Sequence, residues 1–200
     1  MEMNDLTPVE IRVLGTLMEK ESTTPEYYPM TLNSLVAACN QKTNRWPVTD
    51  YTESDLLTAI EGLRTRGFAS VITGGSRVAK YAQRFTEKIN LGRRESAILC
   101  ILMLRGQQTV GEIKGRTERI YAFADLEETE TVLQKMIDRP EGALVQRLPH
   151  SRFAQTMGGP VEAAAATAPA QDRISMLEAE VARLREEVAE LSRRLDEVLN

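Results

Sequence analysis

Hydrophobic residues recur at helical spacing in three stretches near the start of the chain. The first helix is expected to begin after Thr7, because residues 7–10 read Thr-Pro-Val-Glu, a capping box with proline at the first helical position. Thr31 is expected to cap a second helix, and Thr52 with Asp55 a third. The residues predicted to face the core are Ile11, Leu14, Leu17 and Met18, then Leu32, Leu35, Val36 and Cys39, then Leu56, Leu57, Ile60 and Leu63.

A two-stranded ribbon is predicted after the third helix, which is expected to end at Gly67. The segments 68–72 and 78–85 flank the sequence Thr-Gly-Gly-Ser at 73–76, and such a glycine pair between apolar runs indicates a hairpin. Alternation along the second of these strands places Tyr81 on the inward face.

The same order of elements returns in the second part of the chain. Its predicted helices lie near 93–105, from Thr109 and from Asp125, and its strands lie at 143–148 and 152–157. Four local matches line up in order between the two parts, and the last of them pairs the sequence Lys-Tyr-Ala-Gln at 80–83 with Arg-Phe-Ala-Gln at 152–155. Three helices followed by a hairpin are the order of a winged helix. We therefore predict a mainly α fold with small β-hairpins (α+β), with winged-helix domains at 1–85 and 86–157.

The remaining 43 residues carry two further patterns. Residues 158–171 combine glycine, alanine and proline without apolar periodicity, which is typical of a linker. Residues 172–200 then alternate apolar spacings of three and four, a heptad seam that predicts a coiled-coil helix. The seam consists of Ile174, Leu177, Val181, Leu184, Val188, Leu191, Leu195 and Val198.

The composition of the seam favours a parallel homodimer. Its a positions are mostly β-branched and its d positions mostly leucine, which is the preference of two-stranded coils. In that arrangement Arg173 would face Glu178 of the partner chain, and Glu180 would face Arg185. The alternative is a helix that folds back onto its own domains; we favour the dimer because a packed-back helix usually has a wider apolar face.

Composition indicates a soluble cytoplasmic protein that needs neither disulfides nor metals to fold. Hydrophobic residues make up 42% of the chain, and its two cysteines, Cys39 and Cys100, lie in helical apolar patterns without metal-ligand spacing. The first residues lack the pattern of a signal peptide, and the longest apolar run is far shorter than a membrane span. We expect buried free thiols and no membrane association.

Charge argues against a strongly nucleic-acid-binding body. The net charge is −4, but residues 1–157 carry 20 basic and 20 acidic side chains, so the excess acidity lies in residues 158–200. A neutral body lacks the field that supplies most non-specific nucleic-acid affinity. Both predicted third helices also carry acidic residues in their first turns, where a winged helix usually reads bases.

A local basic cluster nevertheless remains as a candidate nucleic-acid site. The loop between the second and third helices contains Lys42, Asn44, Arg45 and Trp46, and the first wing carries Arg77, Lys80 and Arg84. Together they could contact phosphates and stack one aromatic ring on a base. For Trp46 we favour the structural alternative, in which its ring is buried against the third helix and Asn40 and Asn44 shape the helix exit.

No residue pattern indicates catalysis or a cofactor. The only histidine, His150, lies in the predicted turn of the second hairpin, and no serine, cysteine or aspartate constellation can be tied to it. Gly74 and Gly75 are explained by a hairpin, and the chain contains no phosphate-binding loop motif. We predict no catalytic residues, no cofactor and no metal.

The stretches 6–21 and 39–48, together with the tandem winged-helix order, resemble the YceH family of bacterial proteins. The resemblance covers about residues 5–157. It implies a cytoplasmic protein with a pair of winged-helix domains, and it supplies no catalytic or binding residues.

Two functions fit these observations. The first is a dimeric DNA-binding or regulatory protein that contacts nucleic acid through residues 42–46 and the first wing. The second is a protein-interaction adaptor in which the winged helices are packing modules and the coil serves assembly. The fold alone gives a slight preference for the first.

Overall fold

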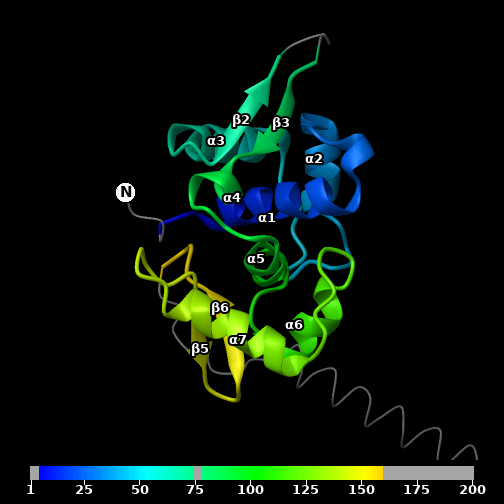
Figure 1. Cartoon of the computed structure of the whole chain (residues 1–200). Coiled ribbons are helices and arrows are strands. Elements are labelled where there is room, and N and C mark those ends of the chain that lie inside the picture. Colours follow the sequence, from blue (N-terminus) through cyan, green and yellow to red (C-terminus); the bar gives the residue numbers. More distant parts are fainter. Residues whose placement is uncertain (1–4, 74–77, 160–200) are drawn as a thin grey trace, which may run out of the picture. The chain divides into compact units, whose positions relative to one another are not determined.

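The computed structural model describes residues 5–73 and 78–159, whose helices and strands form two similar halves (Figure 1). The elements of the first half are α1 (Pro8–Thr23), a short 3-10 turn η1 (Pro25–Tyr27), β1 (Met30–Thr31), α2 (Leu32–Cys39), α3 (Glu53–Thr65), β2 (Ala69–Ile72), β3 (Lys80–Gln83) and α4 (Phe85–Lys88). The elements of the second half are α5 (Arg93–Arg105), β4 (Gln108–Thr109), α6 (Val110–Thr117), α7 (Leu126–Ile137), β5 (Val145–Leu148) and β6 (Arg152–Gln155).

Each half contains a three-stranded antiparallel sheet with the same topology. The strand orders are β1-β3-β2 and β4-β6-β5, so the last strand of each half lies in the centre. Met30 pairs with Tyr81 in the first sheet, and Gln108 pairs with Phe153 at the equivalent position of the second. The internal repeat predicted from the sequence is confirmed in its element order. The two-residue strands β1 and β4 were not predicted.

Local capping rules explain where most helices begin. Thr7, Thr52 and Thr109 each accept a hydrogen bond from the backbone N–H three residues later, and the carboxylate at that later position accepts a bond from the backbone N–H of the capping threonine. The side chain of Asp125 accepts from the N–H of Glu128 at 2.8 Å at the start of α7. The predicted starts of the first and third helices of both halves are therefore correct to within a residue or two.

Two predictions in the first half are wrong in detail. Leu57 was expected to face the core, but its side chain is 45% exposed on α3. The second strand of the wing was expected to run to residue 85, but it ends at Gln83 and the chain turns into α4 at Phe85. Phe85 is fully buried, with its ring edge-on to Phe68 at 4.9 Å between centroids, and this contact draws the chain out of the sheet.

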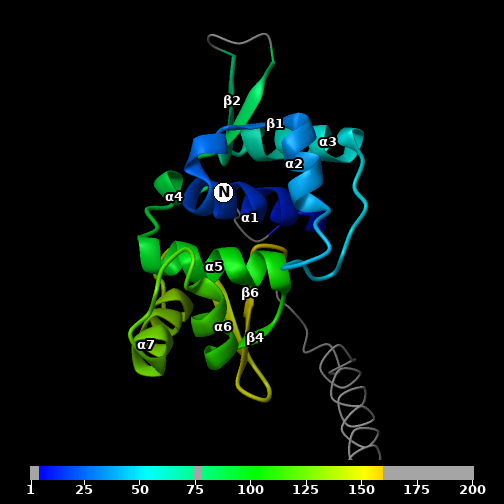
Figure 2. The same ribbon diagram turned by 90° about the vertical axis from the view of Figure 1, so that its right-hand side faces the viewer.

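Helices α1 and α5 pack against each other and join the cores of the two halves (Figures 1 and 2). Every residue from Glu10 to Met18 on α1 and from Ala97 to Leu104 on α5 is buried, so both helices are covered on all sides in these stretches. Gly15 lies at the closest approach, because a Cβ atom there would come within 2.9 Å of the Met103 Cβ. The buried side chains form one continuous cluster through this contact.

Cys39 and Cys100 are buried free thiols, as predicted. Within residues 5–73 and 78–159, no helix has the length and apolar character that a membrane crossing requires. Arg77 lies outside the described residues. The same holds for the predicted coiled coil, with Ile174, Leu177, Val181, Leu184, Val188, Leu191, Leu195 and Val198.

Candidate interaction site

The loop of residues 40–51 connects α2 to α3 and lies against α5 of the other half (Figure 2, cyan). The backbone N–H of Trp46 donates to the carbonyl oxygen of Leu104 at 2.8 Å, and the Arg105 guanidinium donates to the side-chain oxygen of Asn44. These bonds tie the middle of the loop to the C-terminal end of α5. The 40–51 loop therefore belongs to the contact between the two halves.

Asn40 holds the two ends of the 40–51 loop together. Its amide nitrogen donates to the carbonyl oxygen of Tyr51 at 2.8 Å, and its amide oxygen accepts from the Tyr51 N–H at 2.9 Å. The same oxygen accepts from the Thr49 hydroxyl at 3.3 Å. An asparagine that pairs with both backbone groups of a distant residue replaces a missing strand or helix partner. Asn40 thus shapes the helix exit, as the structural interpretation of the sequence proposed.

A buried arginine on α1 supports the inner side of the loop. Arg12 donates to the carbonyl oxygens of Cys39 at 2.9 Å and Pro47 at 2.6 Å, and to the Thr49 hydroxyl at 3.1 Å. Its burial lowers the pKa of the guanidinium from the ordinary value. Hydrogen bonds from a charged donor are about twice as strong as neutral ones. Arg12 therefore fixes both the entry and the middle of the loop.

Arg45 was predicted to face nucleic acid, but the structure places its side chain in the interior, with none of its surface exposed. Its two terminal nitrogens donate to the two carboxylate oxygens of Glu19 on α1, at 2.6 and 3.1 Å. The Nε–H donates to the carbonyl oxygen of Ala38 at 3.1 Å. With its donors used inside the protein, the Arg45 side chain is not available to a phosphate. Its hydrogen bonds connect the loop to α1 and α2 and hold these three segments together.

Because Glu19 pairs with the buried Arg45, its contribution to the stability of the fold depends on pH. Burial alone would raise the pKa of Glu19, but the hydrogen bonds and charge of Arg45 outweigh it and lower the pKa below its ordinary value. The carboxylate therefore stabilises the fold at pH values above about 4.5, the ordinary value, and that stability is lost as the pH falls through the lower pKa of the folded state.

We expect Glu19→Gln to be destabilising at neutral pH and nearly neutral at acidic pH. The free energy of unfolding of both proteins would be measured by urea denaturation between about pH 3 and 7. Asp55, whose pKa is also lowered by hydrogen bonds from Thr52, is unchanged in both proteins and cancels in the comparison. A difference that stays constant over this range would contradict the assignment.

Trp46 is exposed, which corrects the expectation that its ring is buried against the third helix. Its side chain is 52% exposed, and Val48, two residues later, is exposed to the same extent. One edge of the ring lies near α5, since a Cβ atom at Gly106 would be 3.6 Å from Trp46 Cδ1. Trp46, Pro47 and Val48 thus form a small apolar surface, which we call the Trp46 surface.

Fluorescence of the only tryptophan reports directly on this surface. We expect the native protein to show a red-shifted emission and efficient quenching by acrylamide, because half of the Trp46 ring contacts solvent. Quenching constants of native protein, unfolded protein and free N-acetyltryptophanamide would be compared. A blue-shifted emission that acrylamide hardly quenches would mean that the ring is buried after all.

Lys80 and Arg84 lie outside the 40–51 loop that carries Lys42. Lys42 is exposed in the loop, but Lys80 is half-buried in β3, and Arg84 is paired with Glu87 at 3.3 Å at the start of α4. The loop reaches α5, whereas the β2–β3 hairpin projects from the far side of α1 in both views (Figures 1 and 2). The described members of the predicted basic cluster therefore do not form one patch.

The third helices expose mainly acidic and neutral side chains. On α3 these include Glu53, Asp55 and Glu61, and Glu61 also forms an exposed pair with Arg64 at 2.7 Å. On α7 the first turn carries Glu127 and Glu128. The carboxylates in the first turns stabilise the helix N-termini but repel phosphate groups.

The cysteines and the histidine of the described residues do not form a metal-binding cluster. Within that part of the chain, no group of three or more histidine, cysteine or acidic side chains could hold a metal ion. Burial raises the pKa of Cys39 to about 11 and raises that of Cys100 still further, so both thiols stay protonated at neutral pH. His150 lies exposed in the turn between β5 and β6.

Comparison with known proteins gives a consistent set of relatives. The family described as "Protein of unknown function, DUF480" matches residues 6–153. A UPF0502 protein of Solibacter usitatus is 52% identical over 199 residues, covering 96% of this chain and 95% of the relative. UPF0502 proteins of Vibrio atlanticus and Pelobacter propionicus are 42% and 44% identical, each with at least 95% of both chains covered.

Proposed function

The chain belongs to the family of bacterial proteins described as DUF480 and UPF0502, the YceH-like family, and for this member we propose a non-enzymatic adaptor function. In this proposal the protein is cytoplasmic and binds a partner protein through the Trp46 surface. The observation that carries the proposal is an exposed tryptophan on a loop that two buried arginines hold in place. Tryptophan is enriched among the residues that dominate binding energy at protein interfaces.

The rigidity of the loop favours binding. Arg12, Asn40 and Arg45 fix the backbone on both sides of Trp46 through bonds to α1, α2 and the loop itself. A side chain presented on an ordered backbone loses less conformational entropy on association than one on a mobile loop. The exposed Pro47 and Val48 extend the apolar area.

We further propose that the two halves are tandem winged helices used as packing modules. The order of three helices and a three-stranded antiparallel sheet in each half supports this assignment. Acidic first turns on α3 and α7 disfavour insertion of either helix into a DNA groove. The 40–51 loop reaches α5, whereas the β2–β3 hairpin lies on the far side of α1 (Figures 1 and 2), so the basic residues of these two segments do not combine into one DNA-binding surface.

The predicted coiled coil at 172–200 completes the proposal. A parallel homodimer formed by that helix would present two copies of the Trp46 surface. Two linked sites bind a dimeric or repeated partner more tightly than one, because the second contact is intramolecular.

Site-specific photo-crosslinking in cells tests the proposal. A photoreactive phenylalanine analogue at position 46 or 48 is expected to give a protein adduct of defined mass that survives nuclease treatment. The matched control is position 27, since Tyr27 is an aromatic residue that is 75% exposed on a different segment. The purified partner should then bind the Trp46→Ala variant at least about thirtyfold more weakly than the wild type. Equal adducts at 27 and 46, or an unchanged affinity, would refute the proposal.

DNA binding remains the second candidate, and it is favoured by the exposed Lys42 and the exposed Trp46, which lie in the same 40–51 loop. A lysine can contact a phosphate while a base stacks on an aromatic ring. This function predicts salt-sensitive duplex binding that weakens in Lys42→Glu. A low-salt mobility assay without any shift would remove it and leave the adaptor function.

A further inference from the structure

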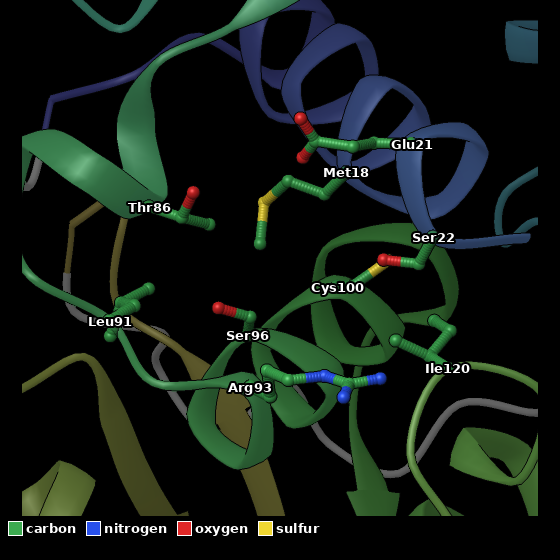
Figure 3. A pocket seen from close by; sticks show the side chains of 9 residues that line it. All are labelled: Met18, Glu21, Ser22, Thr86, Leu91, Arg93, Ser96, Cys100 and Ile120. Atoms are coloured by element: carbon green, nitrogen blue, oxygen red, sulfur yellow. The ribbon is translucent and has the colours of Figure 1, made fainter. Parts of the chain in front are cut away.

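A cavity of about 180 Å³ lies where α1, α4 and α5 meet (Figure 3). None of the residues that line it belongs to the Trp46 surface. Its lining combines charged, hydroxyl and apolar side chains from both halves of the chain. Glu21 and Ser22 on α1 and Arg93 on α5 are exposed, so the cavity opens to solvent at that side. The family comparisons assign no ligand to this chain, and the adaptor proposal does not use the cavity.

A buried glutamine fixes one wall of the cavity. Gln83 is 6% exposed, and its amide nitrogen donates to Oε2 of Glu21 at 2.6 Å and to the Thr86 hydroxyl oxygen at 2.8 Å. Its amide oxygen accepts from the Thr86 N–H at 3.0 Å. Because the Thr86 oxygen accepts from Gln83, its own hydrogen can be donated to a ligand. The second carboxylate oxygen of Glu21 is also left for a ligand.

The other wall carries a positive charge. Arg93 and Ser96 lie in the first turn of α5, and Figure 3 shows them across the cavity from Glu21. Within the described residues Arg93 has no carboxylate partner, whereas Arg94, its neighbour, pairs with Glu128 at 3.1 Å. The Ser96 hydroxyl likewise has no side-chain partner in that part of the chain. Arg93 and Ser96 can therefore bind a carboxylate.

The positive N-terminal end of α5 does not make this cavity a binding site for an anion. Gly92 caps α5, and a Cβ atom there would lie 2.6 Å from a carboxylate oxygen of Glu95. The Glu95 side chain thus already covers the positive end of the helix. A phosphate in the cavity would also face the Glu21 carboxylate, which disfavours a strongly anionic ligand.

A carboxylate and a guanidinium on facing walls match a ligand that carries both charges. A simple amine would pair with Glu21 and leave Arg93 unused, and a simple acid would do the reverse. A zwitterion satisfies both groups, and its apolar part can contact Met18, Leu91 and Ile120. A cavity of this volume suits a ligand of roughly benzene size, far smaller than a nucleotide.

We propose that this cavity is a binding site for a small zwitterion of the amino-acid class. Glu21 and Thr86 bind the ammonium and polar groups, and Arg93 with Ser96 binds the carboxylate. Since the walls come from α1 and α5, the ligand contacts both halves and stabilises their packing. Binding is therefore expected to raise the melting temperature by mass action.

The test uses the purified full chain and free amino acids as probes. Each proteinogenic α-amino acid, together with β-alanine and γ-aminobutyrate, would be screened at about 10 mM by thermal shift, and hits would be measured by calorimetry. At least one probe is expected to bind with a dissociation constant on the order of 0.1–1 mM, in keeping with a small ligand in an open site. The decarboxylated and deaminated analogues of that probe should bind at least about tenfold more weakly.

Charge-neutral variants locate the site. Glu21→Gln and Arg93→Gln are each expected to weaken binding at least about tenfold, while the matched control Arg94→Gln leaves it unchanged. All three positions are exposed, and melting curves without probe would show that the variants remain folded. Absence of any binding probe, or binding that Glu21→Gln and Arg93→Gln leave intact, would overturn the proposal. Neither result bears on the Trp46 surface.

Discussion

Replacing Arg45 with methionine is expected to lower the free energy of unfolding by about 3–5 kcal/mol, the usual cost of leaving one partner of a buried ion pair alone. Arg45 has no exposed side-chain surface, and its partner Glu19 keeps only 14% of its own. Methionine fills a similar volume but leaves the Glu19 carboxylate and the Ala38 carbonyl oxygen without their donors. Urea denaturation followed by circular dichroism measures the change.

Two further variants separate burial from charge. Arg64→Met removes an arginine that is 45% exposed and paired with Glu61, and it is expected to cost at most about 1 kcal/mol. The double variant Arg45→Met with Glu19→Met removes both buried charges, so it should be more stable than Arg45→Met alone. If Arg45→Met and Arg64→Met lower the free energy of unfolding by the same amount, the stabilising role that we assign to buried Arg45 is wrong.

The position of Arg45 shows where prediction from sequence stops. In a helix or strand, periodicity decides which side chains face inward, but the 40–51 loop has no period. Arg45 is buried because Glu19, 26 positions earlier, lies opposite it. Trp46 is turned outward because its backbone is bonded to Leu104 of the other half. Neither partner can be identified from the residues near the loop.

Features set by neighbouring residues were predicted well. The capping pairs Thr7 with Glu10 and Thr52 with Asp55 act over three positions, so the starts of α1 and α3 follow from local chemistry. The matching four-residue segments that became β3 and β6 likewise marked the repeat. Strands β1 and β4 have only two residues each and exist because β3 and β6 pair with them, so no local signal predicts them.

The joined core of the two halves was visible in the sequence only indirectly. The run 97–104 on α5 is apolar without interruption, which is typical of a helix that is covered on every side. On α1 the sequence pattern does not reveal the same burial, because three of the buried residues are polar: Glu10, Arg12 and Thr16. Glu10 closes the capping box with Thr7, and Arg12 bonds to Cys39. Their partners allow polar residues at positions that a simple apolar face would exclude.

The contact between these helices depends on Gly15, and Gly15→Leu is expected to destabilise the protein by about 2 kcal/mol. A Cβ atom at this position would lie 2.9 Å from the Met103 Cβ and 3.2 Å from two Leu104 side-chain atoms. The helices would have to separate, and the bond from the Cys100 thiol to the Gly15 carbonyl oxygen at 3.4 Å would be lost. Overpacking of this kind outweighs the gain of about 1 kcal/mol that leucine brings to a helix over glycine.

Gly115, a second glycine within a helix, provides a control variant that is expected to raise the free energy of unfolding rather than lower it. Gly115 on α6 has no atoms within 4 Å of the position that a Cβ would occupy. Gly115→Ala is therefore expected to stabilise the protein by about 0.5–1 kcal/mol, because alanine restricts the unfolded chain and favours the helix. Urea denaturation of both variants against the wild type distinguishes a packing constraint from helix propensity. Stabilisation by Gly15→Leu as well would mean that α1 and α5 do not meet closely, and that the two halves keep separate cores.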